Sequence, residues 1–386
     1  MARIGRGRWQ GANREQGVRS GQRRVKNKQY GSGEKGQGQR IFKTGLKPEK
    51  PENSMKRILV RATLYSVFLL VAAAPLQAAP EKINASYGAI SGSMAPIWVG
   101  KEARLFEKQG FDLNLVYIPG GPRSIMSLIG NSIQFVNHSG MPALEAYQRG
   151  ADTAMIASSM NQLEHAIIAQ KNITNIEQLR GKVLGISALA SLTDILMREG
   201  LRLSGISDKE VTILPVGDES GRLNSLQTGR VQAVIISGIQ RLMALRMGFK
   251  LLIDFSKLPI EVSGSSILVR RSYVLKNQDI TLGFLKAWIE AVYLFKAKPE
   301  FSIGVLSKYV ANKDPEVLNA IYELNKERLS LRPIPYVRVV KSMMNLLART
   351  RPDLPAASPE GFAEGRFVNE LESAGFFEEM NRQYSK

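Results

Sequence analysis

A glycine-rich turn that carries an arginine is the part of this sequence whose residue types best suit the binding of a small molecule. The turn contains Gly120, Gly121, Arg123 and Ser124, at a point where a helix is expected to begin. Free backbone N–H groups and the helix dipole favour an anionic or polar acceptor at such a place. The Arg123 guanidinium would add a forked pair of donors to a carboxylate or a sulfonate. The alternative is a surface arginine beside an ordinary loop.

A histidine at the end of a strand is the second candidate. Residues 133–137 are strand-like, and His138 and Ser139 follow directly. An imidazole at this point would donate to a molecule bound across a cleft. The alternative is a structural histidine that is satisfied within the protein. His165, the other histidine of the chain, lies within the strand-like run 165–170, and we expect it to be structural.

Several small polar residues follow other predicted strands or begin predicted helices. Open α/β sheets bind ligands at the carboxyl ends of their strands, so these positions are candidate contacts. Turn chemistry and helix capping are the alternatives, and Ser191 suits a helix N-cap. The further candidates are Ser91, Asn161, Ser187, Ser191 and Ser237.

Two acidic residues, Asp218 and Glu219, occupy a second turn of the same kind, where the first turn has Gly120 and Gly121. Acidic residues at a helix N-terminus are explained by the helix dipole alone. If either side chain points into a cleft, it would repel an anion and favour a ligand with an amine or other N–H donors. We include Asp218 among the candidate ligand contacts.

Strands and helices alternate along residues 80–276, which predicts the elements that position these side chains. The pattern is typical of α/β lobes, each a mostly parallel sheet flanked by helices. From about residue 277 onward the pattern is helical. The predicted strands are 82–88, 113–118, 133–137, 153–158, 165–170, 182–187, 211–216, 231–237, 250–255 and 265–271.

An internal repeat predicts that there are two similar lobes. The segments SLIGNSIQFVNHSG (127–140) and SLQTGRVQAVIISG (225–238) share the pattern Ser-Leu-x4-Ile/Val-Gln-x4-Ser-Gly at a constant offset of 98 residues. Each segment lies in the same order of strand, loop, helix and strand. Self-similarity of this kind indicates a duplicated supersecondary unit, although chance matching of common residues is the alternative.

The positive charge of the chain is concentrated at its beginning. The formal net charge is +19, but residues 1–54 carry 14 Lys and Arg against 4 Asp and Glu. Residues 80–386 carry 36 against 30 and are only mildly basic. Residues 1–54 are poor in aliphatic side chains, which predicts disorder. An RNA-binding arm that uses Trp9 and Tyr30 for stacking is the alternative.

Residues 55–79 have the order of a secretory signal peptide. A basic front, an apolar stretch at 64–74 and a cleavage region ending at Ala78 or Ala79 follow one another. The apolar stretch is shorter than the roughly 20 residues of a membrane span, although an uncleaved anchor is the alternative. Met55 is therefore the expected start, with residues 1–54 an over-extended reading frame. The chain has no cysteine, which excludes disulfides and a lipid-modified cysteine and favours a soluble protein of the periplasm.

Residues 82–380 resemble a known family. The segments that carry the resemblance are GKEARLFEKQGFDLNLVYIPGG (100–121), IEQLRGKVLGIS (176–187), REGLRLSGISDKEVTILPV (198–216) and SLQTGRVQAVIISG (225–238). In this order they resemble periplasmic substrate-binding proteins of ABC importers of the nitrate, sulfonate, taurine and thiamine-pyrimidine-precursor type. The chain departs from the family pattern at Gln134 and Gln232, where the family often has Asp.

The resemblance implies a two-lobed periplasmic binding protein of type II with a double-stranded hinge. Lobe 1 would be 80–172 plus 265–386 and lobe 2 would be 173–264, with hinge segments near 170–174 and 261–265. The lobes would close on a sulfonate, a nitrate-like or other organic acid, or a pyrimidine, and deliver it to a permease in the inner membrane. Hinge closure requires contacts from both lobes. The protein would be a monomer without catalytic residues, metal or cofactor.

Two other functions compete with this interpretation. An enzyme on the same fold, such as a pyrimidine synthase or a desulfinase-like hydrolase, is disfavoured because relatives of that sort rely on cysteine. A Ser-His-Asp spacing or a metal cluster does not stand out either. A protein that binds nucleic acid or a membrane surface would depend on residues 1–79 alone, so we expect no nucleic-acid partner.

Overall fold

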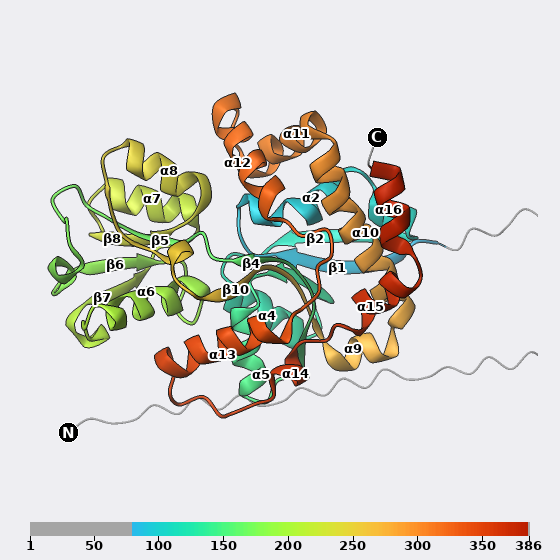
Figure 1. Cartoon of the computed structure of the whole chain (residues 1–386), viewed down its shortest axis with the longest axis horizontal. Coiled ribbons are helices and arrows are strands. Elements are labelled where there is room, and N and C mark those ends of the chain that lie inside the picture. Colours follow the sequence, from blue (N-terminus) through green and yellow to red (C-terminus); the bar gives the residue numbers. More distant parts are fainter. Residues whose placement is uncertain (1–78, 385–386) are drawn as a thin grey trace, which may run out of the picture. The chain divides into compact units, whose positions relative to one another are not determined.

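The computed structural model describes residues 79–384, which form two α/β lobes (Figure 1). The predicted basic extension (1–54) and nearly all of the signal peptide (55–79) lie outside the described residues. Within the described part, the strands form two sheets of five. The strands are β1 Glu81–Tyr87, β2 Phe111–Tyr117, β3 Phe135–His138, β4 Thr153–Gln162, β5 Ala166–Ala169, β6 Val183–Ile186, β7 Thr212–Pro215, β8 Ala233–Ile236, β9 Lys250–Asp254 and β10 Glu261–Arg270.

The two sheets have the same topology. The first has the strand order β2-β1-β3-β10-β4, and the second has the order β7-β6-β8-β5-β9. In each sheet the fourth strand of the order runs antiparallel to both of its neighbours, while the first three strands are parallel. Four of the five strands therefore point the same way, which confirms the predicted mostly parallel sheets. We call the first sheet with the helices packed on it lobe 1, and the second sheet with its helices lobe 2.

The internal repeat corresponds to equivalent positions of the two sheets. The Gln134 side chain accepts from the backbone N–H of Asn84 at 2.9 Å and donates to the Asn131 carbonyl. Gln232 accepts from the N–H of Val183 at 3.0 Å and donates to a carbonyl at the same offset from itself. Each glutamine thus ties the start of its strand to the neighbouring strand. The two departures from the family pattern are therefore structural.

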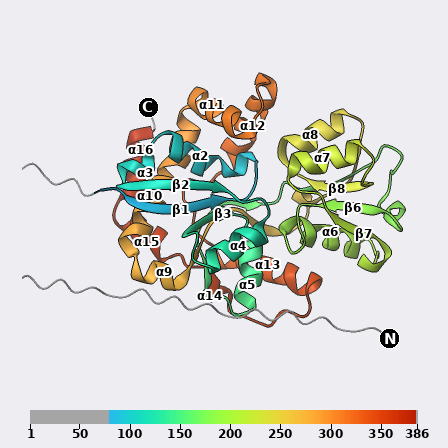
Figure 2. The same ribbon diagram turned by 180° about the vertical axis from the view of Figure 1, so that it is seen from behind.

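Helices cover both faces of each sheet (Figures 1 and 2). On one face of the first sheet, α2 and α10 pack against Ile83 and Phe135, while α4, α5 and α13 cover the other face. In lobe 2, α6 packs on one face and α7 with α8 on the other. The helices are α2 Ala95–Glu102, α3 Leu105–Lys108, α4 Gly121–Ile129, α5 Met141–Gln148, α6 Leu192–Leu203, α7 Glu219–Gln227, α8 Gly238–Arg246, α9 Arg271–Lys276, α10 Gln278–Ala297, α11 Pro299–Val310, α12 Pro315–Arg328, α13 Val337–Thr350, α14 Pro359–Phe362, α15 Arg366–Ser373 and α16 Phe376–Tyr384.

Local sequence signals begin the helices that surround the cleft. Gly120 precedes α4 with φ +83°, and a proline follows in the first turn. Ser191 accepts from the N–H of Asp194 at the start of α6, as the sequence predicts. Asp218 accepts from the N–H of Gly221 at 2.8 Å at the start of α7. Each of these helices directs its N-terminus toward the carboxyl end of a strand, where a ligand of an α/β sheet is expected.

The chain crosses between the sheets at other places than the sequence predicts. Residues 165–170 are expected in lobe 1, but β5 pairs with β8 and β9 in the second sheet. Glu261 at the start of β10 already pairs with Gln162 in the first sheet. The crossing segments are therefore 163–165 and 255–260, not 170–174 and 261–265. The physical reason is that β5 is a short strand, buried along its whole length, and such a run does not indicate which sheet it joins.

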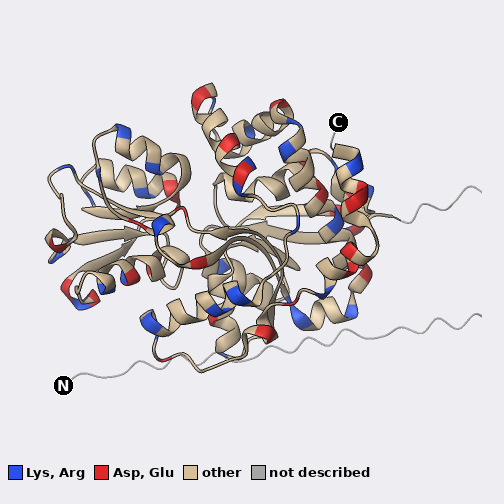
Figure 3. Ribbon diagram, viewed as in Figure 1, with Lys and Arg blue, Asp and Glu red and all other residues tan. Residues whose placement is uncertain are grey.

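Basic and acidic residues are both scattered over the two lobes in the view of Figure 3. This distribution agrees with the mild net charge of residues 80–386. None of the helices within residues 79–384 combines the length and the apolar character needed to cross a bilayer.

Candidate ligand-binding site

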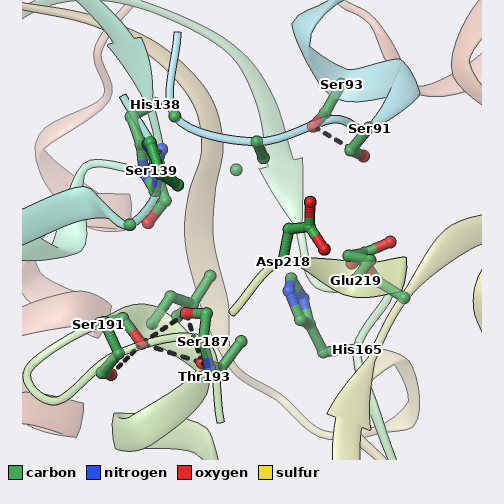
Figure 4. A pocket seen from close by; sticks show the side chains of 18 of the residues that line it. Ser91, Ser93, His138, Ser139, His165, Ser187, Ser191, Thr193, Asp218 and Glu219 are labelled. Atoms are coloured by element: carbon green, nitrogen blue, oxygen red, sulfur yellow. Dashed lines mark hydrogen bonds between the residues drawn. The ribbon is translucent and has the colours of Figure 1, made fainter. Parts of the chain in front are cut away.

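A cavity of about 510 Å³ lies between the two lobes, at the carboxyl ends of strands from both sheets. In Figure 4 the loop with Ser91 and Ser93 and the end of β3 with His138 face the start of α6 and the Asp218 turn. Loops that belong to lobe 1 and loops that belong to lobe 2 therefore line one volume. Nine of the twelve predicted contact residues line this cavity: Ser91, Gly120, Arg123, His138, Ser139, Ser187, Ser191, Asp218 and Ser237.

The other three predicted contacts have structural roles instead. A side chain at Gly121 would place its Cβ 2.4 Å from the ring of Pro142, so this glycine permits close packing of α4 and α5. Ser124 is buried, and its hydroxyl donates to the carbonyl of Ile118. Asn161 accepts from the hydroxyl of Ser158 in the same strand, β4. None of the three lines the cavity.

His138 is held between two glycines. A Cβ at Gly88 would lie 1.6 Å from the imidazole Cδ2, and a Cβ at Gly121 would lie 3.1 Å from Cε1. The backbone N–H of Ser139 donates to His138 Nδ1 at 2.7 Å. The proton of the neutral ring is therefore on Nε2. Burial lowers the pKa of His138 to about 4, so the ring is neutral at physiological pH.

Acid is expected to remove stability that depends on His138. The pKa of His138 is about 4 in the folded protein and 6.5 in the unfolded chain. The contribution of this residue to the free energy of unfolding is therefore fully present above pH 6.5 and is lost as the pH falls toward 4. The unfolding free energy of the wild type relative to His138→Gln should fall by roughly 2 kcal/mol between pH 7 and pH 5. Urea titrations of both proteins at the two pH values measure this difference. A difference that stays constant with pH would contradict a buried neutral imidazole.

Three hydroxyl groups form a closed cluster at the start of α6. The Ser187 Oγ lies 2.9 Å from the Ser191 Oγ and 2.8 Å from the Thr193 Oγ1, and the last two lie 2.9 Å apart. The Ser191 hydroxyl also donates to the Ala188 carbonyl at 2.7 Å. The cluster therefore combines helix capping with a polar surface toward the cavity (Figure 4).

The acidic turn of lobe 2 is divided between the cavity and the protein interior. Asp218 lines the cavity while its Oδ1 caps α7. Glu219 is buried; it accepts from the Ser237 hydroxyl and from Arg222 Nη2 at 3.3 Å. Burial raises the pKa of Glu219 against the opposing effect of Arg222. Glu219 lines the cavity as well, but its carboxylate is engaged by Ser237 and Arg222.

Among the lining residues that sequence reasoning did not place in the site are four with polar side chains that bear on its chemistry: Tyr117, Glu164, His165 and Arg222. The Tyr117 hydroxyl and His165 Nδ1 are buried without a hydrogen-bond partner in the described part of the chain. Burial, followed by the negative charge of Asp218, raises the pKa of Tyr117 to about 12. Burial lowers the pKa of His165 to about 3.

Their positions explain why these four residues were missed. Tyr117 is the last residue of β2, and its place at a strand end was the available signal. Glu164 and His165 lie in a crossing segment, whereas the sequence pattern places Glu164 just before a strand and His165 within it. The predicted position of His165 within a strand is therefore wrong, while its structural role stays a prediction. Arg222 lies one turn inside α7, and its guanidinium donates to the carbonyls of Ile235 and Gly217.

Within residues 79–384, no group of three or more His, Asp or Glu side chains is placed to hold a metal ion. The polar groups of the cavity include hydroxyls, backbone N–H groups, neutral imidazoles and the side chains of Gln162, Arg123, Arg222, Glu164, Asp218 and Glu219. Apolar side chains of Met94, Met160, Leu163 and Leu192 complete the lining. Such a surface suits a molecule with a polar or anionic head and an apolar body.

Similar chains of known structure share this fold. The ligand-binding component of an ABC-type import system from Staphylococcus aureus has a TM-score of 0.62 and 13% identity, covering 75% of this chain and 98% of that chain. The periplasmic aliphatic sulphonate binding protein of Escherichia coli has a TM-score of 0.59 and 21% identity, covering 75% and 99%. The desulfurization enzyme DSZB has a TM-score of 0.56 and 11% identity, covering 76% and 99%. The fold therefore occurs among binding proteins and also in an enzyme.

Sequence comparison adds a relative and a family. A protein of Escherichia coli K12 named for the binding of aliphatic sulfonates is 26% identical over 284 residues, which is 72% of this chain and 85% of that protein. The family model described as NMT1/THI5 like matches residues 91–302. Since this match spans more than half of the chain, the chain belongs to the NMT1/THI5-like family.

Proposed function

We propose that this protein is the solute-binding component of an ABC-type importer and captures a small organic acid by closure of its two lobes. The observation that carries the proposal is the cavity of about 510 Å³ at facing strand ends, which both lobes line. Because the ligand would contact both lobes, its binding would favour the closed arrangement. Similarity to a sulfonate-binding protein and to an import component supports the same function.

The size and lining of the cavity favour an organic acid over nitrate. A water molecule occupies about 30 Å³ of liquid, so a nitrate ion with four heavy atoms would fill a small part of the cavity. Met94, Met160 and Leu192 would contact an apolar body, while Arg123 and the start of α4 would bind an anionic head. Asp218 would bind a donor on the same molecule. A sulfonate or carboxylate with an attached ring or chain meets these requirements.

The proposal also includes export to the periplasm, delivery of the solute to an inner-membrane permease, and a monomeric state. Catalysis is not part of it. The fold similarity to DSZB keeps turnover as an outcome of the test.

A thermal-shift panel tests the proposal. We expect MOPS, ethanesulfonate or an aromatic carboxylate to raise the melting temperature more than nitrate does. At a concentration of 100 times its Kd, a ligand stabilises the fold by about 2.7 kcal/mol, which corresponds to a shift of roughly 5 to 10 °C. Calorimetric titration of the best compound would give its affinity.

A variant with a filled cavity is the control. Ala188 lines the cavity, and its Cβ lies 3.4 Å from the Cβ position of Gly120 in the other lobe. Ala188→Trp should therefore abolish the thermal shift while leaving the melting temperature without ligand nearly unchanged. A panel in which no compound stabilises the wild type, or in which a compound is turned over, would count against the proposal.

A further inference from the structure

Glu164 joins the two lobes behind the cavity, with its carboxylate on the side of lobe 1 and its backbone carbonyl on the side of lobe 2. Arg328, the last residue of α12 in lobe 1, donates from Nη1 to Glu164 Oε2 at 2.6 Å. Glu164 belongs to the segment that crosses from β4 to β5. Arg241 of α8 in lobe 2 donates to the Glu164 carbonyl at 3.3 Å and forms an ion pair with Asp254 at 2.5 Å. We call Glu164, Arg328 and Arg241 the interlobe tie.

The Glu164 side chain contacts three different parts of the site. It is 7% exposed, and it lines the ligand cavity. Both of its carboxylate oxygens lie 3.9 Å from the Cβ position of Gly238, the first residue of α8. The residue that precedes α8, Ser237, makes no capping hydrogen bond with its side chain. The negative charge of Glu164 therefore lies near free N–H groups of lobe 2 while it pairs with an arginine of lobe 1.

Helix α12 also supports the ligand loop of lobe 1. A Cβ at Gly92 would lie 2.1 Å from Asn325 Nδ2 of α12, so loop and helix are in direct contact. Gly92 lies between Ser91 and Ser93, which line the cavity. The position of α12 thus affects both the ligand loop and the partner of Glu164.

The contact between α12 and α8 is incompletely packed. A second cavity of about 10 Å³, close to the volume that holds one water, is lined by Glu164, Gly238 and Asn325. The Oδ1 atom of Asn325 is buried there without a hydrogen-bond partner among residues 79–384. We call this contact between α12 and α8 the seam. Next to this gap the seam also has apolar contacts, since Ile239 of α8 lies in the same apolar core as Leu318 and Ile321 of α12.

The opposite side of the molecule is joined by apolar packing and by two ion pairs. Met343, Leu346 and Leu347 of α13 share one apolar core with Ile195 and Leu196 of α6. Two ion pairs add to this contact, both made with carboxylates that are buried in α6: Arg349 with Glu199 at 3.1 Å and Arg351 with Asp194 at 3.3 Å. Separation of α13 from α6 would expose apolar surface and break both pairs.

We infer that Glu164 is a positioning residue for solute capture, which through Arg328 holds α12 against α8 on the side that opens, while α13 and α6 form the pivot. The link to capture rests on the proposed function, whereas the placement of the opening side and the pivot does not. Burial and the charge of Glu219 raise the pKa of Glu164 to about 7, while Arg328 and Arg241 lower it. The experiments are therefore made at pH 8, where the Glu164 carboxyl group is mostly ionised.

Distances between pairs of spin labels test this inference without any added solute. The chain has no cysteine, so two introduced cysteines label it cleanly. Asn319→Cys in α12 with Asn224→Cys in α7 spans the seam, since α7 packs on α8 in lobe 2. Asn345→Cys in α13 with Lys209→Cys after α6 spans the pivot. All four positions are exposed.

Removal of the tie should lengthen the distance across the seam alone. Glu164→Gln and Arg328→Met should each raise the ratio of long to short seam distances roughly tenfold, because each leaves the other partner unpaired in or beside a buried position. The double variant should show no larger effect than either single variant, and Arg328→Lys should remain near the wild type. The pivot distance should stay unchanged in all of them.

Glu290→Gln is the matched control. Glu290 is 2% exposed and pairs with Lys108 at 2.9 Å, and both residues lie in lobe 1. This variant should lower stability without moving the seam distance. If Glu164→Gln does not fold, Arg328→Met carries the test, because the Arg328 side chain is 25% exposed.

Two results would overturn the inference. One is an unchanged seam distance in folded Arg328→Met. The other is a pivot distance that lengthens as much as the seam distance. If MOPS and ethanesulfonate fail to shorten the wild-type seam distance while the variants lengthen it, the seam and pivot stand and the proposed ligand class fails.

Discussion

Gly88→Ala is expected to destabilise the folded protein by about 3 kcal/mol and to abolish solute binding. The new Cβ would lie 1.6 Å from Cδ2 and 2.3 Å from Nε2 of His138. The imidazole has little room to move, because Gly121 and Pro142 lie on its other side. The backbone of the β1 end or the ring of His138 must therefore shift, and both line the cavity. Urea unfolding and calorimetric titration with the best panel compound measure the two effects.

Two further variants test whether the effect of Gly88→Ala is caused by the clash with His138. Gly304 lies within α11 with nothing within 4 Å of its Cβ position, so Gly304→Ala should be neutral or stabilise the protein by up to about 1 kcal/mol. In the double variant Gly88→Ala with His138→Ala the clash is removed. This variant should recover most of the lost stability but not the binding. If it is no more stable than Gly88→Ala alone, the steric explanation fails.

Arg222→Met is expected to cost 3 to 5 kcal/mol, the usual range for breaking a buried ion pair. Arg222 is 3% exposed and donates to two carbonyls as well as to Glu219. Without Arg222, the buried Glu219 carboxylate has lost its ion pair, and burial already raises the pKa of this carboxyl group. Loss of Arg222 would raise that pKa further. The stability deficit relative to wild type should therefore shrink as pH falls and Glu219 takes up a proton.

Urea unfolding at pH 8 and pH 5 measures this dependence. Adding Glu219→Gln to Arg222→Met should restore part of the stability at pH 8 and remove the pH dependence of the deficit. Arg230→Met, at an exposed position of the same lobe, should change stability by less than about 0.5 kcal/mol. An equal deficit at both pH values would contradict the role assigned to Glu219.

The sequence predicts the order of elements well, because glycine or proline lies beside many of the strands and residues such as Ser191 and Asp218 mark the starts of helices. All ten predicted strands overlap observed ones, and the repeat corresponds to equivalent parts of the two sheets. The crossing points were predicted wrongly. Strand pairing is decided by contacts distant in sequence, and the buried run of β5 fits either sheet.

The candidate site was predicted where it depends on strand ends, as for His138, Ser187 and Asp218. It was missed where a side chain reaches the cavity from a crossing segment or from inside a helix, as for Glu164 and Arg222. Gly121 shows the opposite error: its place in a turn suggested a ligand contact, but its neighbours show a packing role.

The position of β10 has a consequence for the order in which the lobes become native. The second sheet is built from a continuous stretch, from β5 at Ala166 to β9 at Asp254. The first sheet is incomplete until β10, at Glu261–Arg270, enters between β3 and β4. As contacts distant in sequence form slowly, we expect the second sheet to fold first and to act as a preformed neighbour for the first. A chain that emerges from a membrane in order would therefore complete its ligand cavity only after residue 270 has arrived.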